Sequence, residues 1–348
     1  MGRVGVIYWR NGDGVSKQYS KIFENLGHEV FDFLFNDKVP SQLDVVFLHG
    51  PWRSMVPLSN QLLEYPKSER PKLIWWISEQ LPNPALPECY RYGMGRLRSF
   101  LERTAYHQVA SGVWRCRSSL RWSTQKFSRF RYYGDLCWLR DANVLSLLVV
   151  SSPWIANYLR QRDFAPFNPE CLSYYPDWGA DLNMERDIPV LWIGKIATAR
   201  RRRLLNAISN ELQNRDLDLM MVDGEHHPYI FGQERTILLN RTKIVLNLLR
   251  AKWDNNAMRF HLASLNRAMI VTEPMLPHTS FVSGEHLVEA PINQIVDSIC
   301  YYLSHDLERQ KIADNAYELI TRTTRQEVIA KVMEVALGKE NIVDKQRS

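Results

Sequence analysis

Apolar residues recur along the chain in short runs, and one-sided helical patterns lie between several of these runs. The chain opens with an apolar run at 4–9, a helical pattern at 16–26 and an alternating strand pattern at 28–33. Two further apolar runs follow at 43–48 and 72–77, each with the nearly continuous hydrophobicity of a strand that is covered on both faces. Strands that alternate with helices favour a doubly wound parallel sheet.

The same alternation restarts in the second half of the chain. Further strands are expected at residues 147–150, 171–175, 189–193, 217–222, 244–248 and 268–272. Helices are expected at residues 153–160, 201–213, 256–266, 292–304 and 307–322. A polar connector at 180–187 separates the halves, so we expect one α/β domain at 1–184, a second at 185–325, and a helix with a flexible tail at 326–348. Two such domains fit a ligand cleft between them, at the carboxyl ends of both sheets.

The composition is that of a soluble globular protein, with 45% hydrophobic and 24% charged residues. No apolar stretch approaches the roughly 20 residues that span a bilayer, and the first apolar run has the features of a strand instead of a signal peptide. The five cysteines are odd in number and widely spaced, without a CxxC pair. This pattern argues against a disulfide framework or a zinc site and favours a reducing, cytoplasmic location.

The net charge of +6 has a local origin in residues 91–131, where ten basic residues accompany one acid and seven aromatic residues. The segment fits neither half, and we interpret it as an insertion or helical excursion of the first domain. Cations between aromatic rings suit an anionic membrane surface, a phosphate-bearing lipid acceptor or a nucleic acid. The alternative is a solvated helix that packs its rings on the core.

Residues 241–274, RTKIVLNLLRAKWDNNAMRFHLASLNRAMIVTEP, combine a strand, a helix N-terminus and the end of a second strand. A helix N-terminus offers unpaired backbone N–H groups and the positive end of the helix dipole, which together suit a pyrophosphate. The asparagines of the loop supply helix caps. The candidate binding residues in this stretch are Asn247, Asn255, Asn256, Arg259, His261 and Glu273.

A second signal is a glycine at the end of a strand, followed by a basic cluster that opens the next helix. Gly194 and Lys195 follow the strand at 189–193, and Arg200 and Arg201 begin the cluster. A diphosphate needs close approach of the backbone and concentrated positive charge, which this arrangement provides. The alternative is an exposed basic face of a helix.

The stretch at 189–325 resembles the C-terminal half of the group 1 glycosyltransferases, in particular the set related to the spore maturation protein CgeB. In that set a K-I-x-L-N strand leads to a helix with N-x-R-x-F-E and then to a strand that ends in T-E or T-D. The matching residues are Lys243, Ile244, Leu246, Asn247, Met258, Arg259, Phe260, Ala263, Thr272 and Glu273. One position departs: the carboxylate that contacts the donor ribose in the family is His261 here, which lacks two acceptor oxygens.

The resemblance implies a GT-B fold, in which two Rossmann-like, doubly wound domains face each other across a cleft. It implies a hexosyltransferase that moves a sugar from a nucleoside-diphosphate sugar to an acceptor, with retention of configuration and no cofactor besides the donor substrate. No DxD-type metal signature stands at a useful place in the sequence, so we expect the cations near Gly194 to stabilise the leaving diphosphate without a metal. An anionic or lipid-linked acceptor and a peripheral position on the inner membrane face would explain the basic segment.

Three residues at the ends of expected strands in the first half are candidates for a general base, namely Asp13, His49 and Glu79. An inverting enzyme needs such a base to take the acceptor proton, and Glu79 is our first choice. Each of the three also suits a loop-capping role. Two alternatives stay open: a basic nucleic-acid-binding or scaffolding protein with a GT-B fold and no turnover, and a glycosyltransferase that modifies DNA.

Overall fold

The structure is a computed structural model that describes residues 2–50, 54–78, 81–109, 113–117, 128–169, 173–253, 257–277 and 280–338. The chain forms two compact units, residues 1–169 with 326–348 and residues 170–325. The border therefore lies before the expected position at 184/185. Helix α12 (Arg325–Ala336) returns to the first unit, where Lys72 donates a hydrogen bond of 2.8 Å to the carbonyl of Ala336.

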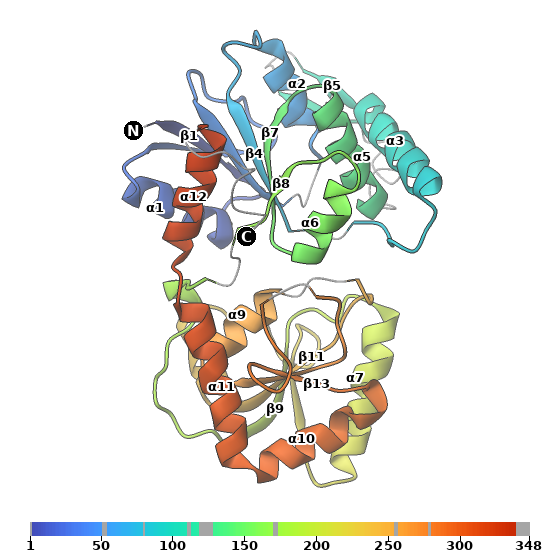
Figure 1. The fold of residues 1–348 in the computed structure, drawn as a ribbon, viewed down its shortest axis with the longest axis vertical. Helices are drawn as coiled ribbons and strands as arrows, with labels where there is room; N and C mark the ends of the chain where they lie inside the picture. The colour runs from blue at the N-terminus through green and yellow to red at the C-terminus, as the bar shows by residue number, and fades with distance from the viewer. Residues whose placement is uncertain are drawn as a thin grey trace. The chain divides into compact units, whose positions relative to one another are not determined.

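The first unit contains a parallel sheet with the strand order β2-β1-β3-β4-β7-β8. The strands are β1 (Arg3–Tyr8), β2 (Glu29–Leu34), β3 (Val45–Gly50), β4 (Lys72–Ile77), β7 (Leu145–Val150) and β8 (Pro166–Phe167). The helices are α1 (Gly14–Asn25), α2 (Val56–Glu64), α3 (Glu88–Ala105), α5 (Ser128–Asp141) and α6 (Pro153–Arg160). Figure 1 shows α1 and α12 on one side of this sheet and α2, α3 and α5 on the other.

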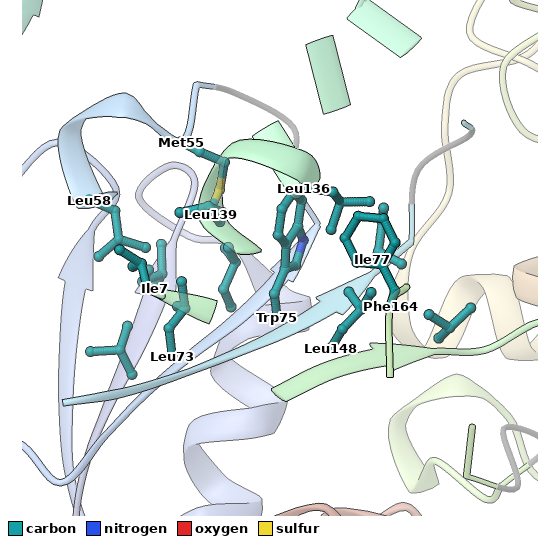
Figure 2. Close-up of a cluster of buried hydrophobic side chains, with 14 of the residues drawn as sticks. Ile7, Met55, Leu58, Leu73, Trp75, Ile77, Leu136, Leu139, Leu148 and Phe164 are labelled. Atoms are coloured by element: carbon teal, nitrogen blue, oxygen red, sulfur yellow. The ribbon is translucent and has the colours of Figure 1, made fainter. Parts of the chain in front are cut away.

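Helices on both sides explain why the strands are apolar along their whole length. Trp75 points towards α2 and α5, among Met55, Leu136 and Leu139 (Figure 2), and its indole N–H donates to the carbonyl of Gly50 at 3.0 Å. The next residue of β4, Trp76, points to the other side, with its ring 6.1 Å from that of Tyr19 in α1. The alternation of side chains along β4 thus fills both layers of the core.

The basic segment 91–131 consists, in its described part, of most of α3, an antiparallel hairpin and the start of α5. The hairpin pairs β5 (Tyr106–Gln108) with β6 (Trp114–Cys116).

The second unit repeats the architecture with a parallel sheet of strand order β10-β9-β11-β12-β13. The strands are β9 (Ile188–Ile193), β10 (Leu219–Val222), β11 (Thr242–Asn247), β12 (Met269–Thr272) and β13 (Val288–Glu289). The helices are η2 (Pro176–Trp178), α7 (Ala199–Gln213), α8 (Gly232–Asn240), α9 (Ala257–Leu265), η3 (Ile292–Gln294), α10 (Ile295–Ser304) and α11 (Asp306–Thr321).

Two buried clusters lie on the two faces of this sheet. Leucines and isoleucines of α7 and α10 pack on one face, and apolar residues of α8 and α9 pack on the other. The strand expected at 171–175 is wrong in its described part: residues 173–175 form only a single bridge, between Tyr174 and Thr324. An apolar run forms a strand only where a neighbouring strand can pair with it, and here the pairing is limited to Tyr174 and Thr324.

Candidate functional site

The order of strands in the second sheet reverses between β9 and β11, and an open α/β sheet binds ligands outside the carboxyl ends of its strands at such a point. Arg259 of α9 joins the ends of these two strands. Its Nε donates to the carbonyl of Ile193 at 2.8 Å, and its Nη1 donates to Oδ1 of Asn247 at 3.0 Å. The guanidinium group lies 4.0 Å from the ring centroid of Trp192. Arg259 therefore holds the edge of the sheet where a ligand is expected.

Arg200 and Glu273 form a second connection at the same edge. The two Nη atoms of Arg200 donate to the carboxylate of Glu273 at 2.9 and 2.5 Å, and Arg200 Nη1 also donates to the carbonyl of Leu249 at 2.8 Å. Glu273 accepts a further bond from the backbone N–H of Leu249 at 2.7 Å. Both charges are thus engaged within the protein, and they hold the chain that follows β11.

Arg201 is buried beneath the first turn of α7. Its Nε donates to the carbonyl of Leu248 at 2.8 Å, and its guanidinium lies 5.4 Å from the ring centroid of Trp192. The expected binding residues Asn247, Arg200, Arg201, Arg259 and Glu273 therefore do come together. Their hydrogen bonds to one another and to the backbone hold the strand ends in place.

The loop between β9 and α7 makes a tight turn with two residues at positive φ. Gly194 has a φ of 107° and Ala197 a φ of 62°, both in the region that L-residues rarely adopt. The indole N–H of Trp192 donates to the carbonyl of Gly194 at 2.7 Å. Thr198 caps α7, because its Oγ1 accepts a bond of 3.2 Å from the backbone N–H of Arg201. The loop thus points the N-terminus of α7 into the space beyond β9.

A surface pocket of about 580 Å³ lies at this helix N-terminus. Its lining residues are Lys195, Ala197, Thr198, Ala199, Arg202, Arg203, Asn206 and Glu225. Lys195 and Arg203 are exposed, and neither takes part in an ion pair within the described residues. Arg202 pairs with Glu225 at 2.7 and 2.9 Å. Three cations against one carboxylate, at the positive end of a helix dipole, give this pocket the electrostatics that suit an anion.

Sequence reasoning missed Arg202, Arg203 and Asn206. It selected the arginines nearest to Gly194. The apolar positions of α7 would have shown which of the arginines face the solvent. Leu205 and Leu212 are buried with helical spacing, so position 201 faces the sheet while positions 202, 203 and 206 face away from it.

The loop after β10 brings Glu225 to the pocket. Oδ1 of Asp223 accepts bonds of 2.8 Å from the backbone N–H groups of Glu225 and His226, and Oδ2 lies 2.7 Å from Nδ1 of His226. Burial alone would raise the pKa of Asp223, but these hydrogen bonds outweigh it and hold the pKa below its usual range. The ionised Asp223 therefore orders its own loop and fixes Glu225 beside the cations.

His261 lies in the interior of the second unit. Its ring meets the rings of Tyr175 and Trp178 edge-on, with centroids 6.0 and 5.5 Å apart, and its Nε2 is 3.5 Å from a terminal nitrogen of Arg325. Residues that are two positions apart in a helix point in directions that differ by about 200° around the helix axis. The side chain of His261 therefore points away from that of Arg259. Its expected contact with a ribose stays a prediction, and the candidates Asn255 and Asn256 lie outside the described residues.

The candidate bases of the first unit have different surroundings. The carboxylate of Asp13 caps α1: it accepts bonds from the backbone N–H of Val15 at 3.2 Å and from the hydroxyl of Ser16 at 2.8 Å. His49 ends β3 beside the reversal of the first sheet, with its ring centroid 5.3 Å from that of Tyr19. Glu79 lies outside the described residues. The cap role explains Asp13 without a catalytic function.

Two further properties concern metals and membranes. Among the described residues, no group of three or more His, Cys, Asp or Glu side chains is placed to hold a metal ion. None of the described helices combines the length and the apolarity needed to cross a bilayer.

Comparison with known proteins identifies a related family and related folds. Residues 200–334 match the family model described as glycosyl transferase-like. Sucrose-phosphate synthase from Thermosynechococcus elongatus is 10% identical, with a TM-score of 0.59, over 97% of this chain and 99% of that chain. HepE of Anabaena, determined in complex with UDP and glucose, is 9% identical, with a TM-score of 0.56, over 98% of this chain and 100% of that chain.

A TarM variant of S. aureus in complex with UDP is 10% identical, with a TM-score of 0.55, over 84% of this chain. The present chain spans about half the length of TarM, 54% and 55% in two structures. Comparison with curated proteins gives no match. These likenesses confirm the fold expected from the sequence: the chain has a GT-B fold of two Rossmann-like units, and its residues 200–334 match the glycosyl transferase-like family.

Proposed function

We propose that the chain is a nucleotide-sugar-dependent glycosyltransferase that binds the diphosphate of its donor in the pocket beside α7. The observation that carries this proposal is that Lys195 and Arg203 are exposed at a helix N-terminus, next to the reversal of the second sheet, and form no ion pair with any described residue. The match of residues 200–334 to the glycosyl transferase-like family supports it, because this stretch includes four of the eight residues that line the pocket, Arg203 among them.

The pocket suits the chemistry of a departing nucleoside diphosphate. Negative charge develops on the leaving group as the bond to the sugar breaks, and fixed cations and backbone N–H groups stabilise that charge. Lys195, Arg203 and the first N–H groups of α7 supply these contacts in the proposal. Arg259 and Asn247 act indirectly, because they hold the strand ends that position the loop at 194–198.

The finer features of the proposal follow the resemblance to the CgeB-like set. The transfer of a hexose would be metal-independent and retaining, so that the leaving diphosphate itself takes the acceptor proton. If the enzyme inverts configuration instead, His49 or Glu79 would act as the base. The acceptor would be a cell-surface polymer or a lipid-linked, anionic molecule reached from the cytoplasm.

A panel of UDP, GDP, ADP and their sugars tests this proposal in a thermal-shift assay. A working donor site should raise the melting temperature with one nucleotide, because a ligand that binds only the folded state stabilises it. The matching nucleotide-sugar should then be hydrolysed slowly, at a rate that EDTA leaves unchanged.

Salt-dependent binding of duplex DNA, without an effect of any nucleotide, would contradict the proposal and favour a nucleic-acid-binding protein. One observation already weakens that alternative. Arg91, Arg98 and Arg131 of the basic segment are buried, so these three cations do not face a polyanion.

A further inference from the structure

Helix α3 in the first unit buries three charged side chains and exposes most of its large apolar ones. The side chains that face inward are charged: Arg91 and Arg98 are 3% and 4% exposed, and Glu102 is 1% exposed. The large apolar side chains are exposed, at 49% for Tyr90, 49% for Leu97, 59% for Phe100 and 39% for Leu101. A surface helix of a globular protein normally shows the opposite arrangement.

The inner face of α3 packs closely against α5 through small and polar residues. A Cβ added to Gly134 of α5 would lie 1.9 Å from the carbonyl oxygen of Gly95, so the two helices meet backbone to backbone. The hydroxyl of Ser99 donates to Asp135 at 2.8 Å, and Arg131 lies 3.7 Å from Glu102. Small residues and interhelical polar contacts are the means by which helices associate where the surroundings are apolar.

The exposed apolar residues form one stripe. Tyr90, Leu97 and Leu101 are seven and four residues apart, and Phe100 lies beside them, which places all four on the same side of the helix. Figure 1 shows α3 at the margin of the first unit, beside α5. The ring of Tyr90 meets that of Phe130 of α5 edge-on at 5.8 Å, while Leu97, Phe100 and Leu101 remain 39–59% exposed and take no part in the described hydrophobic cluster on that side of the sheet.

Positive charge accompanies the stripe, and carboxylates are absent from it. Arg96 and Arg103 lie seven residues apart along its flank, where Arg96 donates to the carboxylate of Asp141 at 2.6 Å and Arg103 lies 4.2 Å from the ring centroid of Trp138. The hairpin after α3 carries the exposed Arg115 and Arg117. The two carboxylates of α3 are both engaged elsewhere: Glu88 accepts a bond of 2.7 Å from Arg162, and Glu102 is buried beside Arg131. The exposed face thus offers apolar side chains and cations together.

We propose that this face of α3 docks on an anionic lipid bilayer, with Leu97 and Phe100 inserted among the headgroups. Aromatic and aliphatic side chains next to arginines are the composition of helices that lie in the interface plane of a membrane. A second copy of the chain fits the face less well. Two copies would bring Arg96 and Arg103 near the same residues of the partner helix, and the nearby carboxylate of Asp141 is already bonded to Arg96 and Arg140 within one chain.

Flotation of the full chain with vesicles tests the proposal. Vesicles of equal parts phosphatidylcholine and phosphatidylglycerol should carry the protein upward, and those of phosphatidylcholine alone should carry much less. The double variant Leu97→Ser, Phe100→Ser should bind the anionic vesicles at least about tenfold more weakly, because it loses both inserted side chains and adds no charge. Added salt should weaken binding of the wild type.

The matched control is Leu307→Ser, which makes the same change at a leucine of α11 that is 89% exposed. It should float like the wild type. All three proteins should keep the same melting temperature, because the replaced side chains are exposed.

Two results would overturn the proposal. The first is a flotation result: either the wild type stays with the soluble fraction, or the double variant floats as well as the wild type does. The other is that light scattering shows a wild-type dimer that the double variant converts to a monomer, without vesicle binding, because the face would then cover a second copy. Neither result bears on the donor pocket, which lies in the other unit.

Discussion

Replacing Arg259 with methionine keeps an unbranched apolar stem of similar volume near the backbone but removes the guanidinium group and its hydrogen-bond donors. The carbonyl of Ile193 and Oδ1 of Asn247, both on buried residues, then lose the bonds of 2.8 and 3.0 Å that they accept now. A buried acceptor without a donor costs about 1–3 kcal/mol, so the two together cost about 2–6 kcal/mol. The lost contact with the ring of Trp192 adds about 0.5–2 kcal/mol.

We therefore expect Arg259→Met to lower the free energy of unfolding of the second unit by about 3 kcal/mol or more. For a unit of this size, that loss lowers the melting temperature by about 6–12 °C. Urea denaturation and thermal melts followed by circular dichroism measure both quantities.

Arg203→Met is the matched control, because Arg203 is exposed and has no ion pair among the described residues. Its stability should stay within about 0.5 kcal/mol of the wild type, while its affinity for a nucleoside diphosphate falls. Arg259→Met should instead lose mainly stability, with a smaller change in its affinity for a nucleoside diphosphate. Equal melting temperatures for the two variants would refute the assignment of Arg259 as the residue that holds the strand ends.

Gly134→Ala should destabilise the first unit by about 1–3 kcal/mol, because its Cβ would lie 1.9 Å from the carbonyl oxygen of Gly95. Gly93→Ala, where nothing lies within 4 Å, should be neutral or slightly stabilising in the same urea titration. Burial raises the pKa of Asp135 to about 6, so the folded state keeps a proton that the unfolded chain loses above about pH 4. The free energy of unfolding of the wild type should therefore fall as the pH rises from about 4 to 6. Asp135→Asn should lack this part of the pH dependence when its free energy of unfolding is measured at both pH values. Glu225→Gln should tighten the binding of a nucleoside diphosphate by about two- to tenfold in calorimetry, because it frees the guanidinium group of Arg202 from its ion pair with the carboxylate. An unchanged affinity would place the ligand elsewhere.

Much of the fold follows from local patterns in the sequence. The strand at 72–77 has the predicted bounds, because an unbroken apolar run suits only a strand with helices on both faces. The helix at 153–160 also has its predicted bounds. Ser152 caps it, with a bond of 3.2 Å from the backbone N–H of Ile155, and Pro153 occupies its first position.

The sequence predicted which strand ends and helices form the site, but not which of their side chains face the pocket. The strand end at Gly194 and the basic start of α7 were identified, but which arginine faces the solvent depends on the rotation of the helix about its axis. The buried orientation of His261 depends on Tyr175 and Trp178, which are far away in the sequence.

Helix α3 shows where pattern reasoning fails for a physical reason. The rule that apolar stripes face the core would turn Leu97 and Phe100 inward. In the structure, the close contact of Gly95 with Gly134 and the buried charges beside it hold the stripe outward. Only tertiary contacts between two helices distant in sequence reveal this inversion.

Isothermal titration calorimetry of nucleoside diphosphates tests the central claim, that the pocket at the start of α7 binds the donor diphosphate. The wild type should bind one of UDP, GDP and ADP at a single site, and Lys195→Ala should bind it at least about tenfold more weakly, since a cation that contacts a phosphate contributes about 1.4 kcal/mol or more. Lys311→Ala, at an exposed lysine of α11 in the same unit, should bind like the wild type. Equal affinities for Lys195→Ala and the wild type, or no binding of any of the three nucleotides, would contradict the account.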